Sequence, residues 1–374
     1  MMLKGIQFQL RVGVRNSAPV PRGTIDALDA IEVRVEPARA TFQLTFVIDR
    51  KTQLLDAFLP TDRPPQQLRV ILAVTISGTP DVLIDGVITH QELNPGSAGA
   101  PTTLTVTGED LTVLMTREEL TGTPFAGLEP KARVEQVLAK YAQWGIQPEV
   151  IRPSLHMASS PAQATAQQHG HDLDYIQQLA THVGHVFYLR PTPQPGTTIA
   201  YWGPQMRRGT PQRPINVDLD SQTNAEGLSF TFDHTQREDP QVHVQDPDSK
   251  QPTQLPPADP TQVDTPLGRV QPEAFRKPII NNVANRTPAE ATLMAQGIAT
   301  RSADSVTASG KLSVTRYGGL LRPRELVSLR GAGLAFDGLW WVESVTHAIK
   351  RNDYSQSFTL KRNALVSSIA RVAA

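Results

Sequence analysis

The chain of 374 residues contains no cysteine, which excludes disulfide bonds, thiolate metal ligands and cysteine nucleophiles. It also lacks an excess of either charge, because 36 basic and 36 acidic residues give a formal net charge of zero. A dedicated nucleic-acid-binding protein would show a basic excess, so we expect no specific nucleic-acid partner. No stretch approaches about eighteen apolar residues, and the amino-terminus has no continuous apolar run. We therefore expect no membrane-spanning segment and assembly in the cytoplasm.

The sequence has few patterns that are typical of catalysis. Its glycine-containing segments lack the spacing and the lysine of a phosphate-binding loop. Neighbouring carboxylates at Glu109-Asp110 and Glu118-Glu119 would suit the acid and base of a glycosidase. They lie beside a predicted short helix that Asp110 could cap, where acidic residues are expected for capping and charge reasons. We predict a protein that is not an enzyme and has no cofactor.

Four histidines surround one predicted helix. His169 and His171 precede it, and His182 and His185 lie at its carboxyl end. Imidazoles at such spacings can bind zinc. However, His171 and His182 are separated by roughly 16 Å along a helix axis, so one ion could contact both only if the chain bends. The helix dipole also explains a histidine at the helix end. The four residues are weak metal candidates, and no metal is predicted.

Period-two alternation of apolar residues dominates both ends of the chain, and it predicts half-buried antiparallel strands. The spacing of strands and turns predicts a barrel or sandwich for residues 1–112 and a small barrel for residues 306–368; the resemblance described below implies that both are tube-like β-barrel domains. In the second module the alternation changes phase at Glu343-Ser344, which predicts a β-bulge. His347 alternates with apolar residues in the same strand and is interpreted as a core or interface histidine.

Helical periodicity marks the middle of the chain. Residues 113–205 contain two amphipathic helices, one after Pro130 and one from about Asp172, followed by strands, which predicts an α/β domain. Thr287-Pro288-Ala289-Glu290 is a capping box, so residues 286–305 are expected to form a helix that packs on the α/β domain.

Two further segments connect these parts. Residues 206–237 are expected to supply one or more strands to the second barrel, which is then discontinuous. Residues 238–285 are rich in proline and glutamine, with few apolar residues, and are expected to form a long loop or arm. The predicted fold is α+β and mainly β, with two small antiparallel barrels that flank an α/β domain.

Two adjacent tryptophans are the best interface candidates. Neighbouring strand residues point to opposite faces, so one of Trp340 and Trp341 should enter the core and the other should face outward, where a tryptophan suits a subunit interface. Arg322 and Arg324 are further candidates, because arginine is favoured at interfaces. A small basic patch of arginines is interpreted as a solvated loop or a subunit contact; it comprises Arg207, Arg208 and Arg213.

Two segments carry residues at characteristic spacings. The carboxyl-terminal one contains Leu321-Arg322-Pro323, Val327, Gly331, Phe336-Asp337-Gly338, Trp340, Val342, Val345, His347 and Ile349. The central one contains Asp172, Tyr175, Ile176, Leu179, Ala180, Gly184, Phe187 and Tyr188. Together they resemble the baseplate hub proteins of contractile tails: the late-control D proteins of phages, the hubs of phage-tail-like injection particles, and the front part of type VI spike proteins. One departure is Arg324-Glu325, where the family often has Pro-Gly.

The resemblance implies a structural hub that forms a homotrimer. Two barrels per chain would give six barrel domains around an axis, so that the ring matches a six-fold inner tube on one side and a three-fold spike on the other. The implied partners are further copies of the chain, the inner tube protein, a separate spike protein and baseplate wedge proteins, within a phage tail or phage-tail-like particle. The implied mechanism is transmission of the contraction stroke. Two alternatives stay open: a tail-associated cell-wall hydrolase, and a receptor- or carbohydrate-binding tail protein.

Overall fold

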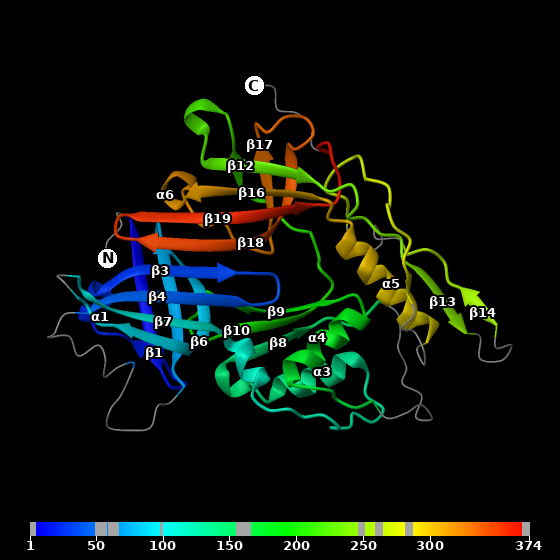
Figure 1. The fold of residues 1–374 in the computed structure, drawn as a ribbon, viewed down its shortest axis with the longest axis horizontal. Coiled ribbons are helices and arrows are strands. Elements are labelled where there is room, and N and C mark those ends of the chain that lie inside the picture. The colour runs from blue at the N-terminus through cyan, green and yellow to red at the C-terminus, as the bar shows by residue number, and fades with distance from the viewer. Residues whose placement is uncertain are drawn as a thin grey trace.

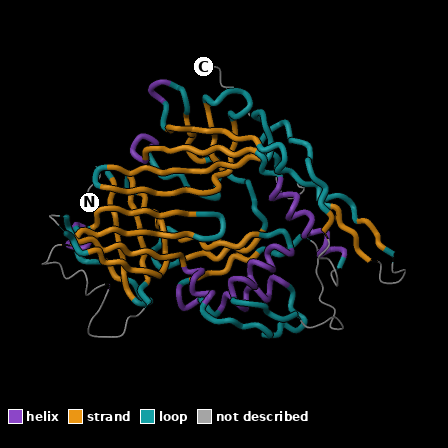
Figure 2. Tube along the Cα trace, in the orientation of Figure 1, coloured by secondary structure: helices purple, strands orange, loops and turns teal. Residues whose placement is uncertain are grey.

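The computed structural model describes residues 5–48, 58, 67–97, 100–154, 166–245, 251–258, 265–280 and 287–368. Its fold is mainly β with antiparallel sheets, as predicted (Figure 1). Figure 2 shows strands crossing the body of the molecule, with helices along its lower side and at one end.

The amino-terminal module is built from strands with one apolar face. Its elements are β1 (Ile6–Gly13), β2 (Ala18–Pro19), α1 (Arg22–Asp26), β3 (Leu28–Val35), β4 (Ala40–Ile48), β5 (Arg69–Ile76), β6 (Thr79–Asn94) and β7 (Thr102–Asp110). In β3 the alternation buries Ile31 and Val33 and exposes Glu32 and Arg34, so the period seen in the sequence is the period of burial. The strands are ordered β3-β4-β7-β6-β5-β1-β2, and all these neighbours are antiparallel.

The carboxyl-terminal module takes strands from two distant parts of the chain. Its elements are β11 (Gln212–Asn216), η3 (Asp220–Gln222), β12 (Ala225–Phe232), β16 (Val306–Ser313), α6 (Val314–Tyr317), β17 (Leu326–Arg330), β18 (Gly338–Lys350) and β19 (Asp353–Arg362). β12 pairs with β16, so the predicted discontinuity is confirmed. The register of β18 against β19 shifts between Val342 and Ser344, which confirms the predicted bulge.

The two β modules are joined edge to edge. β18 pairs antiparallel with β3, from Val345 opposite Val35 to Lys350 opposite Ala30. In the described residues this junction makes one 13-stranded sheet, and the buried side chains of both modules form one continuous apolar cluster. The sequence predicted both modules but not their fusion, because nothing in either pattern specifies the partner of an edge strand.

An α/β unit packs beside this sheet. Its elements are η1 (Leu111–Thr116), α3 (Pro130–Ala139), η2 (Ala142–Trp144), β8 (Ile146–Val150), α4 (Asp172–His182), β9 (Val186–Pro191) and β10 (Thr198–Gly203). The Asp110 carboxylate accepts the Thr112 backbone N–H at 2.9 Å and so caps η1, as predicted. Trp202 is fully buried, and its indole N–H donates to the Ile176 carbonyl at 3.2 Å, which fixes α4 on the small sheet.

The segment 238–285 differs from the predicted loop or arm in one respect. Its described part contains β13 (Gln241–Gln245), β14 (Pro252–Gln254) and β15 (Ile279–Ile280), in the order β14-β13-β15. These strands form because α5 (Pro288–Ser302) offers them an apolar surface. Val242 of β13 and Ile280 of β15 pack on Met294 of that helix. The sheet extends along the side of the molecule farthest from β1 (Figure 1).

Helix α5 begins and packs through two local features. Thr287 Oγ1 accepts the Glu290 N–H, and the Glu290 carboxylate accepts the Thr287 N–H at 2.9 Å, which confirms the capping box. Further along, α5 crosses the end of α4 at Gly297, where an added Cβ would lie 2.7 Å from the Cα of Gly184. This close approach requires glycine.

Candidate assembly interface

Arg322 and Arg324, the predicted interface arginines, connect parts of the same chain. Arg322 is about half exposed, and its Nε donates to the Asp81 carboxylate on β6 at 2.7 Å. Arg324 Nη2 donates to the Glu36 carbonyl at 2.6 Å, and its guanidinium lies over the ring of Tyr188 at 4.1 Å from the centroid. These contacts join the carboxyl-terminal module to the amino-terminal module and to the α/β unit. Contacts of either arginine with another subunit stay a prediction.

The backbone of Arg324 is strained at this junction. Its φ is 62°, in the left-handed region that side-chain-bearing residues rarely adopt. Such a conformation costs about 1–3 kcal/mol and persists only when its surroundings impose it. The hydrogen bond to Glu36 and the stacking on Tyr188 impose it here. Arg324 therefore connects three parts of the fold: the carboxyl-terminal module, the amino-terminal module and the α/β unit.

Trp340 and Trp341 do point to opposite faces of β18, but neither indole faces solvent. Trp340 is fully buried in the main core, whereas Trp341 packs with Leu326 under Leu267 and is 6% exposed. The prediction of an outward-facing tryptophan is therefore wrong. A residue from the segment after 264 covers the second indole, and strand alternation cannot reveal a cover that comes from so far away in sequence.

The basic patch predicted at Arg207, Arg208 and Arg213 does not form as a unit. Arg207 is buried, forms a bidentate ion pair with Asp304, and lies 5.9 Å from the ring centroid of Trp341. Arg208 and Arg213 are exposed. Arg207 was expected in a solvated loop or a subunit contact; instead its side chain is buried within the chain, where it connects the loop after β10 to the end of α5 and to the carboxyl-terminal module.

A second buried ion pair joins the amino-terminal module to the α/β unit. The Arg69 guanidinium on β5 donates to both carboxylate oxygens of Asp85 on β6, at 2.7 and 2.6 Å, and both side chains are at most 5% exposed. Arg69 also donates to the Gly196 carbonyl, and Thr198 donates to Asp85 at 3.1 Å. Sequence reasoning missed this site. The available signal was a charged residue beside or within an apolar run: Arg69 directly precedes the run 70–74, and Asp85 interrupts the run 82–88. A charge that is buried with such a run must be paired.

A third polar cluster orders the α/β unit. The buried Asp172 carboxylate, at the start of α4, accepts hydrogen bonds from Lys140 at 3.0 Å, Tyr141 at 2.8 Å and Gln168 at 2.8 Å. Burial and the neighbouring Asp172 carboxylate raise the pKa of Tyr141 well above its usual value. Because Tyr141 stays protonated, it can keep donating to Asp172, and α3 and α4 are held together.

The four histidines have separate environments. His171 Nδ1 lies 2.9 Å from the Asp174 carboxylate, and this hydrogen bond lowers the pKa of Asp174. His185 is buried edge-on against Trp202, and burial lowers its pKa to about 4. His169 is exposed and His182 is half-buried. Across the described ranges, no group of three or more potential ligand side chains could hold a metal ion.

His347 has structural surroundings. His347 is 3% exposed, its Nδ1 lies 2.8 Å from the Tyr354 hydroxyl, and burial lowers its pKa to about 4. This confirms a core histidine.

The candidate carboxylates also have structural surroundings. Burial raises the pKa of Asp110, whose carboxylate accepts hydrogen bonds from the Thr112 and Ala40 amides. Of the other three acids, Glu109 lies 3.9 Å from an arginine nitrogen, Glu119 accepts a threonine hydroxyl, and Glu118 is exposed.

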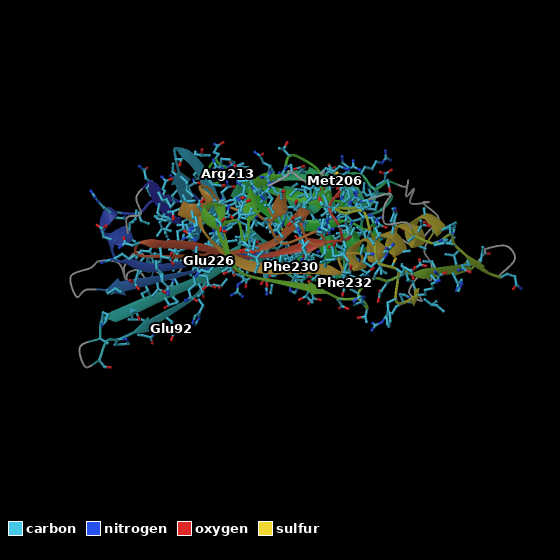
Figure 3. The ribbon with its side chains drawn as sticks, turned by 90° about the horizontal axis from the view of Figure 1, so that it is seen from above. Glu92, Met206, Arg213, Glu226, Phe230 and Phe232 are labelled. Carbon is cyan, nitrogen blue, oxygen red and sulfur yellow. The ribbon has the colours of Figure 1, made fainter. Side chains whose placement is uncertain are left out.

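The large sheet ends at β12 with an open edge. The Asp233 N–H donates to the Ser305 carbonyl, so strand alternation directs the backbone groups of Phe230 and Phe232 away from β16. Within the described residues no strand pairs with that edge. The rings of Phe230 and Phe336 stack with 4.5 Å between their centroids. Figure 3 shows Phe230 and Phe232 along one side of the molecule. An aromatic-lined free edge suits contact with another chain.

No protein-family model and no curated protein matches the sequence. Solved structures do match. A tail protein from Neisseria meningitidis MC58 aligns with a TM-score of 0.63 and 15% identity, over 97% of this chain and 98% of that chain. The E. coli c3393 protein is a type VI secretion component described as similar to the T4 tail proteins gp27 and gp5. It aligns with a TM-score of 0.56 and 14% identity, over 91% of this chain and 76% of that chain. A chain of a Francisella PdpA–VgrG complex aligns with a TM-score of 0.59 and 9% identity, over 100% of this chain and 60% of that chain.

These matches confirm, at the level of fold, the resemblance inferred from the sequence. The chain has the fold of phage tail proteins and of type VI spike-related proteins over nearly its whole length. None of the helices in the described part combines the length and the apolar character that a membrane crossing requires.

Proposed function

We propose that this chain is the structural hub of a contractile tail or phage-tail-like injection machine. It acts as a homotrimer that joins a six-fold inner tube to a separate three-fold spike, contacts baseplate wedge proteins, and transmits the contraction stroke without bond chemistry. The observation that carries the proposal is the match to tail proteins over almost the full length of both chains. The proposed place of action is a tail particle assembled in the cytoplasm.

Three features of the structure support a role in bearing force. The two β modules share one sheet through β3 and β18, so a load on one passes to the other through backbone hydrogen bonds. Arg324 and the Arg69–Asp85 pair tie this sheet to the α/β unit. The open edge of β12 offers a place where a neighbouring subunit can continue the sheet.

The test is the solution mass by light scattering, alone and with purified tube and spike proteins. Three chains of 40.9 kDa give about 123 kDa, and we expect this mass and a further increase when a spike trimer is added. Arg322→Ala should reduce the trimer fraction, whereas Arg34→Ala, at a similarly exposed arginine, should not. A monomer of 40.9 kDa that binds neither partner would refute the proposal.

A further inference from the structure

The segment 275–280 forms an open edge on the small sheet that packs on α5. It runs parallel to residues 239–242: the Asp239 N–H donates to the Arg276 carbonyl and the Gln241 N–H to the Pro278 carbonyl, both at 2.8 Å. Because peptide groups alternate along a strand, those of Lys277 and Ile279 point away from β13. In the part of the chain that the structure describes, no strand occupies this outer edge.

The outer face of this edge is apolar at both ends and basic in the middle. Phe275 is 62% exposed and Ile279 is 57% exposed, and Lys277 between them is exposed as well. Period two places Lys277 and Ile279 on one face of the strand, whereas Ile280 turns inward and packs on α5. Phe275 lies at the bend just before the strand, where its N–H donates to the Arg237 carbonyl at 2.9 Å. Natural proteins rarely leave an apolar edge strand uncovered, since it recruits other strands.

Within the segment itself, basic side chains outnumber acidic ones. The basic side chains in residues 265–280 are Arg269, Arg276 and Lys277, against the single acid Glu273. Among the described residues none of these three cations forms an ion pair. Asp233 interacts electrostatically with Arg276, and Glu238 lies opposite Arg276 across the two strands. Lys277 is therefore the cation, among the described residues of this edge, that stands beside exposed apolar side chains without an ion pair.

A cleft of about 330 Å³ adjoins the same segment. Arg276 and Arg301 both line it, together with Ile298 of α5 and the acidic residue Glu238. Burial lowers the pKa of Arg301, and no carboxylate in the described residues pairs with it. Positive charge is therefore present on both sides of the strand, as Lys277 on the outer face and as Arg276 and Arg301 in the cleft beside Glu238.

We propose that residues 275–280 receive an extended segment of a different protein by β-strand addition. The chemistry of the edge specifies that segment: an acidic residue opposite Lys277, between apolar residues opposite Phe275 and Ile279. A second copy of this chain does not fit, because the same edge would oppose its own lysine and arginine, and like charges on paired strands repel. Placing the partner within an injection particle rests on the function proposed above.

The test uses the full chain and two fluorescein-labelled peptides, Thr-Val-Thr-Glu-Thr-Val-Thr and the same peptide with lysine in place of glutamate. We expect the glutamate peptide to bind at least about fivefold more tightly, as measured by fluorescence anisotropy. Lys277→Glu should invert this preference. Lys311→Glu is the matched control, because Lys311 is also exposed but lies on β16, which has neighbours on both sides.

Hydrogen exchange locates the contact. The glutamate peptide should slow exchange of the amides of Lys277 and Ile279. Equal affinity for the two peptides, no binding of either, an unchanged preference in Lys277→Glu, or protection only outside residues 275–280 would each overturn the proposal. A monomer in light scattering with an intact peptide preference would instead refute the trimeric hub and leave strand addition standing, so the two failures are distinguishable.

Discussion

Arg69→Met tests whether the buried Arg69–Asp85 pair holds the sheet to the α/β unit. The substitution removes two charge-assisted hydrogen bonds and the contact to the Gly196 carbonyl. It leaves the Asp85 carboxylate 1% exposed, with the Thr198 hydroxyl at 3.1 Å as its remaining side-chain donor. Removing one partner of a buried ion pair costs about 3–5 kcal/mol, since the other charge stays desolvated. We expect a loss of that size in the free energy of unfolding.

The measurement is urea unfolding followed by tryptophan fluorescence and circular dichroism. Trp144 and Trp202 lie in the core of the α/β unit, and Trp340 in the core of the β modules, so single-tryptophan variants report on each part. If the Arg69–Asp85 pair couples the β modules to the α/β unit, the unfolding transitions of the two parts coincide in the wild-type protein. In Arg69→Met both transitions should shift to lower urea concentration and also separate from each other.

Two variants control for other causes. Arg34→Met removes an exposed pair with Glu32, which is about half exposed, and should change stability by less than about 1 kcal/mol. Arg69→Met combined with Asp85→Leu removes both buried charges and should recover most of the loss. If Arg69→Met alone costs less than about 1 kcal/mol, or if the double variant is no more stable than the single one, the reasoning is refuted.

Three further predictions concern stability. Gly297→Ala should lower the free energy of unfolding by about 1–3 kcal/mol, because the added Cβ clashes with Gly184, despite the greater helix propensity of alanine. Gly23→Ala in α1 is the control, because its added Cβ meets open space. Equal melting temperatures for the two variants would contradict this prediction. Burial lowers the pKa values of His185 and His347 in the folded state to about 4, below the ordinary 6.5. Their contribution to the free energy of unfolding should therefore be fully present above pH 6.5 and be lost as the pH drops towards 4. His347→Gln should flatten that decline in urea midpoints, and an unchanged slope would argue against it. Thr287→Ala should lower stability by about 1 kcal/mol through loss of the cap on α5, measured by thermal unfolding, and a neutral result would count against the cap.

Local features were predictable because neighbours in sequence create them. The bulge at Glu343-Ser344 follows from a change of phase within one strand, and the structure has its register shift there. The caps at Asp110 and Thr287 follow from side chains within three residues of the amides they bind. These signals depend on spacings of two to four residues, which the sequence displays directly.

The sequence by itself determined the alternating strands of the two β modules, the helices of the α/β unit, helix α5 and the resemblance to tail hubs, but not the strands β13, β14 and β15. Only the tertiary structure decided that β3 pairs with β18, that Leu267 covers Trp341, and that Phe275 and Ile279 lie on an open edge. The physical reason is that alternation reports which face of a strand is apolar, but not which distant segment covers that face or pairs with its edge. Those choices depend on the packing of parts that lie far apart in the sequence.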